Sequence, residues 1–224
     1  MFKTLLGFRK GKDFLTQVLD SFDTMLFDTR TMFASSYGNL FEEEEAPGLK
    51  DDIYEIDRRV NSIEKDIRRM VINHLALQPT VDTPTCLILM SVVKDAERLG
   101  DFAKNLLEVR SLLEKPLDRE IYSSLFKKMD EDILKLFDMT RDAFIDSDEE
   151  QAKNTWEYQR RIKMRCNDII FKAARSTLST NEAVCLALLA RYFKRICSHL
   201  TNIATSVIVP LDNLDYFYEE TSDE

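Results

Sequence analysis

The chain has 224 residues, of which 44% are hydrophobic and 32% are charged, so it can build a sizeable core and still cover many solvated faces. Only five glycines and five prolines are present, which favours long helices and short connections over a turn-rich β protein. The net charge of −9 argues against sequence-independent binding to nucleic acid, because the phosphates would be repelled.

The cysteines do not form a pattern typical of a zinc or disulfide framework. They are Cys86, Cys166, Cys185 and Cys197, each within an apolar or helical run and none in a CxxC pair. We expect buried free thiols, which fits a reducing cytosol and predicts a cytoplasmic protein.

Membrane insertion is not expected. The longest apolar runs, at 86–93 and 183–190, are far shorter than the roughly 20 residues of a spanning helix, and no signal peptide is recognised. The basic and partly apolar segment 1–12 is compatible with peripheral membrane contact at most, because one weakly amphipathic stretch anchors poorly.

In chain order, the first expected helix spans 12–42 and ends at the EEEEAPG stretch. The second, 49–77, has the clearest apolar periodicity of the chain. Its seam consists of Ile53, Ile56, Val60, Ile63, Ile67, Met70, His74 and Leu77. Because the only other histidine is far away in sequence, we expect His74 to be packed or hydrogen-bonded rather than a metal ligand.

Four further helices are predicted at 84–113, 118–145, 148–178 and 181–209. Pro84 is placed to open the first of these, and the S-x-x-E sequences at 147–150 and 179–182 are typical of capping boxes at the starts of the last two. No segment shows sustained alternation of polar and apolar residues, so no sheet is expected. The predicted fold class is all-α, with six long helices whose short connections favour antiparallel neighbours.

The second half of the chain echoes the first. The segment IDRRVN at 56–61 is matched by YQRRIK at 158–163, and AERLGDFAKNL at 96–106 is matched by FKRICSHLTNI at 193–203. Two matches in the same order indicate a tandem repeat of a three-helix unit.

These segments resemble the PhoU family of phosphate-signalling proteins. The first copy reads E97-R-L-G-D101-F-A-K-N105-L, close to the family phrase ERIGDxAxNI, and Asp57, Asn61, Ile63 and Glu64 match the preceding helix. The resemblance spans about 10–210 and implies two tandem three-helix bundles with pseudo-twofold symmetry. It suggests domains at 1–114 and 115–210, followed by an acidic, aromatic tail at 211–224.

The resemblance also implies a function. It suggests a cytosolic regulator of phosphate uptake and phosphate-starvation signalling that binds a transporter ATPase subunit or a sensor histidine kinase and forms homo-oligomers such as dimers. The alternative is an accessory bundle of a different, Pit-type transporter, or a structural oligomer without metal dependence. No catalytic residues are predicted, because the sequence has neither a nucleophile–histidine–acid pattern nor a glycine-rich phosphate loop.

One candidate metal site follows from the residues themselves. Glu97 and Asp101 share one helix face, and so do Asp57 and Asn61. If the two helices pack antiparallel, three carboxylates and one amide converge, which suits hard cations such as magnesium or manganese. The resemblance adds iron and zinc as possible metals. A bound cation would offset the repulsion between Glu97 and Asp101, and Gly100 would permit close approach.

A second interpretation of the same face remains open. Lys94, Arg98 and Lys104 lie within one turn of these acids, and Arg58 and Arg59 flank Asp57. The charges can neutralise one another as a salt-bridged surface worth about 0–1 kcal/mol per pair, with Gly100 serving helix packing.

The second copy departs from the family pattern. Gln159, Lys163, Lys194 and Ser198 stand where the first copy has Asp57, Asn61, Glu97 and Asp101. Two ammonium groups make a second metal cluster, with or without the nearby His199, electrostatically unfavourable. Lys163 and Lys194 are instead able to bind an anion, to pair with nearby acids such as Glu157, or to remain solvated.

Overall fold

The structure is a computed structural model that describes residues 12–78 and 82–215. Every regular element in these residues is helical and none is a strand, which confirms the predicted all-α class. The predicted acidic tail lies outside the described residues from 216 onward, and the basic N-terminal segment lies outside them up to residue 11.

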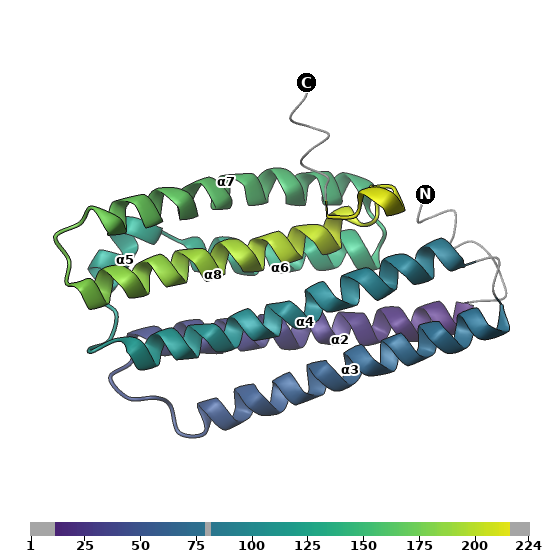
Figure 1. Cartoon of the computed structure of the whole chain (residues 1–224), viewed down its shortest axis with the longest axis horizontal. Coiled ribbons are helices and arrows are strands. Elements are labelled where there is room, and N and C mark those ends of the chain that lie inside the picture. Colours follow the sequence, from purple (N-terminus) through teal and green to yellow (C-terminus); the bar gives the residue numbers. More distant parts are fainter. Residues whose placement is uncertain (1–11, 79–81, 216–224) are drawn as a thin grey trace.

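Within residues 12–78 and 82–215, seven α-helices make up two units that lie side by side. The first repeat contains α2 (Lys12–Gly38), α3 (Leu49–Leu77) and α4 (Thr83–Leu112). The second repeat contains α5 (Arg119–Phe126), α6 (Met129–Ile145), α7 (Glu149–Ala174) and α8 (Thr180–Thr205). The long helices all run lengthwise, so the described part of the chain is elongated (Figure 1). Two 3₁₀ turns, Asn39–Phe41 and Leu211–Asn213, follow α2 and α8.

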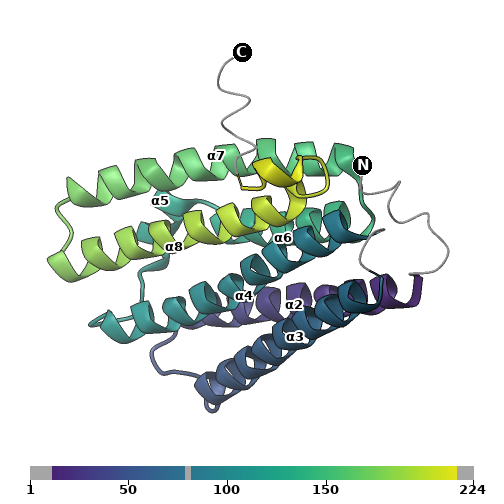
Figure 2. The same cartoon turned by 45° about the vertical axis from the view of Figure 1, so that its right-hand side comes forward.

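The two repeats meet along helices that both units contribute. Helix α4 packs along α8, and α2 packs against α6, while α3 and α7 lie on the outer sides (Figures 1 and 2). Within the repeats, α7 packs along α8, and α2 packs against both α3 and α4. This arrangement places the sequence motifs of α3 and α4 side by side, and likewise those of α7 and α8.

The prediction of one helix over 118–145 is wrong, because α5 ends at Phe126 and α6 begins at Met129. Lys127 adopts a left-handed φ of 55°, a conformation that breaks the helix at this point. Arg165 of α7 donates a hydrogen bond of 2.7 Å to the carbonyl oxygen of Phe126 and satisfies the helix end. The rings of Tyr122 and Phe126 stack at 4.6 Å and are buried, so tertiary contacts set this break.

The other predicted helices form, with shifted ends. The first ends at Gly38 instead of 42, the fifth at Ala174 instead of 178, and the last at Thr205 instead of 209. The capping box at 179–182 is confirmed, since the Ser179 hydroxyl accepts from the Glu182 N–H and Glu182 accepts from the Ser179 N–H. The box at 147–150 is wrong, because the Asp148 carboxylate accepts from the N–H groups of Glu150 and Gln151.

The seam of α3 is buried where it meets its neighbours. Ile53, Val60 and Ile67 are at most 1% exposed. Leu77, which continues the same stripe in sequence, is 82% exposed at the helix end, so its assignment to the seam is wrong. His74 is hydrogen-bonded as expected: its Nε2 lies 2.8 Å from Oδ2 of Asp82, and Phe14 stacks on its ring at 4.0 Å.

A continuous apolar core joins the two repeats. Phe33 of α2 lies 6.0 Å from Phe137 of α6 and 5.8 Å from Phe193 of α8, measured between ring centroids, and all three rings are almost fully buried. Aromatic pairs at such distances stabilise a core beyond the area that they bury. All four cysteines are buried and free, which confirms that prediction.

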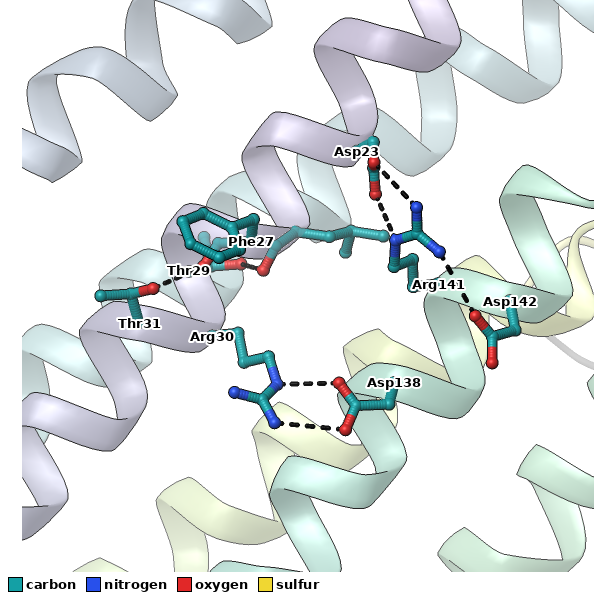
Figure 3. A network of polar contacts seen from close by, with 9 residues as sticks. Asp23, Phe27, Thr29, Arg30, Thr31, Asp138, Arg141 and Asp142 are labelled. Carbon is teal, nitrogen blue, oxygen red and sulfur yellow. Dashed lines mark hydrogen bonds and ion pairs between the residues drawn. The ribbon is translucent and has the colours of Figure 1, made fainter.

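Two ion pairs connect α2 to α6 at the surface of this junction (Figure 3). The Arg30 guanidinium donates to Asp138 at 2.9 and 3.2 Å, and the Arg141 guanidinium donates to Asp23 at 2.6 and 3.0 Å. Both contacts are bidentate, a geometry that fixes direction as well as distance. They therefore orient the two repeats relative to each other.

None of the described helices combines the length and apolar character that crossing a bilayer requires.

Candidate functional site

The strongest motif residues of the first repeat meet around one ammonium group. The Nζ atom of Lys104 lies 2.8 Å from Oδ1 of Asp57 and 3.0 Å from Oδ1 of Asp101. Asp57 comes from α3, whereas Lys104 and Asp101 lie one turn apart on α4. Burial alone would lower the pKa of Lys104, but the hydrogen bonds with Asp57 and Asp101 outweigh it and raise the pKa.

The remaining members of the predicted cluster surround this contact. Asn61 donates a hydrogen bond of 3.3 Å to Oδ2 of Asp57, and Arg98 donates one of 3.0 Å to Oδ2 of Asp101. Glu97 lies on the same face, and its pKa is raised by burial, then by the negative charges of Asp101 and Glu64. The structure thus brings all four predicted residues, Asp57, Asn61, Glu97 and Asp101, to one place between α3 and α4.

These side chains are occupied by the protein's own cations. In the described part of the chain, no three histidine, cysteine or carboxylate side chains form a group that is able to hold a metal ion. The arrangement does not fit a metal ion unless the ammonium group of Lys104 leaves Asp57 and Asp101. Metal coordination by Asp57, Asn61, Glu97 and Asp101 stays a prediction from the sequence.

Gly100 lies where α4 faces α2 and α3. A methyl group at this position would lie 3.5 Å from Cε of Met32 and 3.6 Å from Oδ1 of Asp57. These are ordinary van der Waals distances, so the close approach does not require the absence of a side chain.

A second polar contact joins the two motif helices across the repeats, and sequence reasoning missed it. The Oδ1 atom of Asp95 on α4 lies 2.6 Å from Nδ1 of His199 on α8 and accepts a hydrogen bond of 3.3 Å from Asn202. Asp95 is buried, so these partners satisfy a carboxylate that would otherwise be costly. The one feature of the sequence that could have indicated this contact is the position of Asp95, a carboxylate two residues before the acidic motif on the same helix.

The counterpart residues of the second repeat are also brought together. Gln159 and Lys163 of α7 and Lys194 and Ser198 of α8 all line one cavity. Here no carboxylate stands at any of the four positions, so this site differs in charge from the cluster of the first repeat.

Comparison with known proteins agrees with the two-repeat fold. The model of the PhoU domain matches residues 22–109 and 126–207, which correspond to the two repeats. No curated protein matches the chain. Two solved structures share the fold, each with a TM-score of 0.74.

The first of these structures is the phosphate transport system regulatory protein PhoU from Streptococcus pneumoniae, at 16% sequence identity over 90% of this chain and 95% of that chain. The second is PhoU from Pseudomonas aeruginosa, at 20% identity over 89% of this chain and 97% of that chain. Because the domain model covers most of the sequence in two tandem copies, this chain belongs to the PhoU domain family.

Proposed function

We propose that this protein is a cytosolic, non-catalytic regulator of phosphate uptake and phosphate-starvation signalling. Its partner in this role is a phosphate transporter, through the ATPase subunit, or a sensor histidine kinase. The observation that carries the proposal is the presence of two PhoU domains in one chain. Their shared fold is similar, over 90% of this chain, to that of a protein named as a phosphate transport system regulatory protein.

An adaptor role agrees with the chemistry of the best-formed site. In the acidic cluster the charged groups of Asp57, Lys104 and Asp101 are paired with each other, which stabilises the α3–α4 contact. Regulation by such a bundle then depends on the surfaces it presents to partners. Homo-oligomerisation is part of the same proposal and is measured by light scattering coupled to size-exclusion chromatography.

A second candidate function is an accessory role beside a Pit-type transporter, without metal dependence. It is supported by the same Lys104 contacts, which supply a cation from the chain itself where the family resemblance implies a metal. The two candidates differ in the partner and in the response to metal, so both are open to one experiment.

The test combines deletion with capture of the full-length protein. We expect deletion of the gene to change expression from a phosphate-starvation promoter in phosphate-replete cells. We expect cross-linked, tagged protein to retain a transporter ATPase subunit or a sensor kinase. A variant with a charge in the shared core, Phe193→Asp, serves as the unfolded control. Retention of a Pit-type permease would favour the second candidate, and an unchanged promoter with neither partner would contradict both.

A further inference from the structure

We propose that the cavity between α7 and α8 binds a small phosphate-type oxyanion that carries two or more negative charges. The cavity has a volume of about 590 Å³ and is lined by side chains of both helices and by Asp215, which follows the last 3₁₀ turn. It lies at the second-repeat positions that correspond to the acidic cluster, and we name it the basic pocket.

The basic pocket concentrates positive charge on a chain whose net charge is −9. Its walls carry five cationic side chains and one carboxylate. The cations are Arg160, Lys163, Arg191, Lys194 and Arg195. In the described residues, no ion pair with an acid is made by Arg160, Arg191, Lys194 or Arg195, whereas Arg30 and Arg141 at the junction of the repeats are both paired. A multivalent anion would supply the missing counter-charge.

The environment of Lys194 points the same way. Its pKa is lowered by burial and then by the positive charges of Lys163 and Arg191. In the described residues, the only hydrogen bond of its ammonium group is to the neutral Oδ1 atom of Asn167, at 2.8 Å. Crowded cations of this kind favour the binding of an anion between them.

A neutral donor on the wall of the pocket adds a second, independent feature. Gln159 is only 5% exposed, lines the pocket, and has no hydrogen-bond partner in the described residues. Although the residue as a whole is mostly buried, its amide group keeps contact with the open space of the pocket. Its side-chain amide is able to donate to an oxyanion in the pocket, as a complement to the charges of Lys163 and Lys194.

The corresponding site of the first repeat, the acidic cluster, has charges that are neutralised by groups of the chain itself. There Asp57, the counterpart of Gln159, accepts from Lys104 and Asn61. In the second repeat an amide, Gln159, stands in place of that acid and Lys163 in place of Asn61, and both side chains line the basic pocket. The pair of substitutions converts a self-neutralised cluster into a cationic one.

Two acidic groups, Asp95 and Asp215, lie near the pocket beside His199. Asp95 accepts from His199 and Asn202, and the pKa of Asp215 is raised by burial and by Asp95. An anion is therefore expected at the opposite end, beside Lys163, Lys194 and Arg191. The volume leaves room for inorganic phosphate, pyrophosphate or a phosphate ester.

The chain supplies its own probe for the test. Trp156 is the only tryptophan, lines the basic pocket, and lies with its ring 4.9 Å from the guanidinium carbon of Arg160. We expect its fluorescence to change saturably when sodium pyrophosphate or inorganic phosphate is titrated into the full-length protein at constant ionic strength. Potassium chloride alone, at the same ionic strength, is the baseline.

Matched variants locate the binding. Lys163→Gln/Lys194→Gln removes two pocket charges and should weaken pyrophosphate binding at least about tenfold, because charge-assisted hydrogen bonds are lost. Lys153→Gln/Lys172→Gln removes two charges from α7 outside the pocket and should leave binding unchanged. Circular dichroism and thermal melting establish that both variants are folded. Equal weakening in the two variants, or no saturable binding of either anion to the wild type, would overturn the proposal.

The same phosphate chemistry occurs in lipid headgroups, so a membrane is a separate arm of the test. Sedimentation with phosphatidylglycerol vesicles should show no binding that depends on Lys163 and Lys194, because the whole chain is strongly acidic. Binding to vesicles without binding of either soluble anion would also overturn the proposal. These measurements use purified protein alone, so their result is independent of which transporter or kinase the protein regulates.

Discussion

The ammonium group of Lys104 lies 2.8 Å from the Asp57 carboxylate and thereby joins α4 to α3 inside the first repeat. Both side chains are mostly shielded from solvent, with exposures of 20% for Lys104 and 11% for Asp57. A cation supplied by the chain thus occupies the centre of the cluster in which the sequence predicted a metal ion. The consequence is that the stability of this repeat depends on Lys104.

Replacing that cation should destabilise the protein. Lys104→Met keeps most of the side-chain volume but leaves Asp57 buried with only the amide of Asn61 as a partner, and leaves Asp101 with Arg98. We expect the free energy of unfolding in urea to fall by about 1–3 kcal/mol. Arg98→Met is the control: its side chain is 47% exposed, and we expect a loss below about 1 kcal/mol. Equal losses in both variants would contradict a special role for Lys104.

Metal addition separates the two interpretations of the same cluster. In the wild type we expect no rise in melting temperature with manganese or magnesium, because Lys104 already neutralises Asp57 and Asp101. In Lys104→Met the carboxylates are released, and we expect manganese to raise the melting temperature. A rise in the wild type that Glu97→Ala/Asp101→Ala abolishes would instead support the metal site predicted from the sequence.

Gly100 provides a test of whether the motif glycine is needed for packing. In Gly100→Ala the new methyl group would lie 3.5 Å from Met32 and 3.6 Å from Asp57, which requires no displacement. Because glycine is about 1 kcal/mol less favourable than alanine inside a helix, we expect unchanged or increased stability, by up to about 1 kcal/mol. The midpoint of urea unfolding measures this. A loss of more than about 1 kcal/mol would mean that α4 packs more closely on α2 than these distances indicate.

Most of the fold was readable from local patterns. The stripe of Ile53, Val60 and Ile67 and the capping box at Ser179 are local signals, and the structure confirms both. The break at Lys127 was not readable, because no glycine or proline marks it. It is imposed by tertiary contacts: the buried rings of Tyr122 and Phe126, and the donation of Arg165 to the end of α5.

The sequence predicted which residues of the candidate sites lie close together, but not which charged side chains pair with each other. Helical spacing and the internal repeat were sufficient to predict that Asp57 lies near Asp101 and that Gln159 lies near Lys194. Which cation neutralises which acid depends on side-chain reach between helices, and spacing along one helix does not contain that information. The link from Asp95 to His199 was missed for the same reason, since its partners are 104 residues apart.

The start of α8 predicts a pH dependence of stability. The pKa of Glu182 is lowered by its hydrogen bond with Ser179 and then by Lys115, whose Nζ lies 3.2 Å from Oε1. A lowered pKa means that the stabilisation is complete above the unfolded value of 4.5 and is lost as the pH falls through the lower, folded pKa. Glu182→Gln should therefore reduce stability at pH 7, and by less at pH 3.

The size of this effect is limited by exposure. Because the Lys115 side chain is 68% exposed, we expect a difference below about 1 kcal/mol at pH 7, measured by urea unfolding at both pH values. Lys115→Met separates the two causes, since it removes the ion pair and leaves the capping box intact. A difference between the wild type and Glu182→Gln that is the same at pH 3 and pH 7 would exclude ionisation of Glu182 as the cause.

The ion pairs of Figure 3 make the junction of the repeats sensitive to salt. Arg141 and Asp23 are 46% and 35% exposed, so a double-mutant cycle of Arg141→Gln and Asp23→Asn should give a coupling energy of about 0.2–1 kcal/mol in low salt. At about 1 M salt the Debye length falls to roughly 3 Å, and we expect the coupling energy to shrink.

The exposed Lys128–Glu131 pair, three residues apart on one segment, is the control because it does not join the repeats. Amide hydrogen exchange in α2 measures whether the junction depends on the Arg141–Asp23 pair. We expect faster exchange when Arg141 or Asp23 is substituted, and unchanged exchange when Lys128 or Glu131 is substituted. Equal exchange in all of these variants would show that the buried rings of Phe33, Phe137 and Phe193 hold the repeats together without this ion pair.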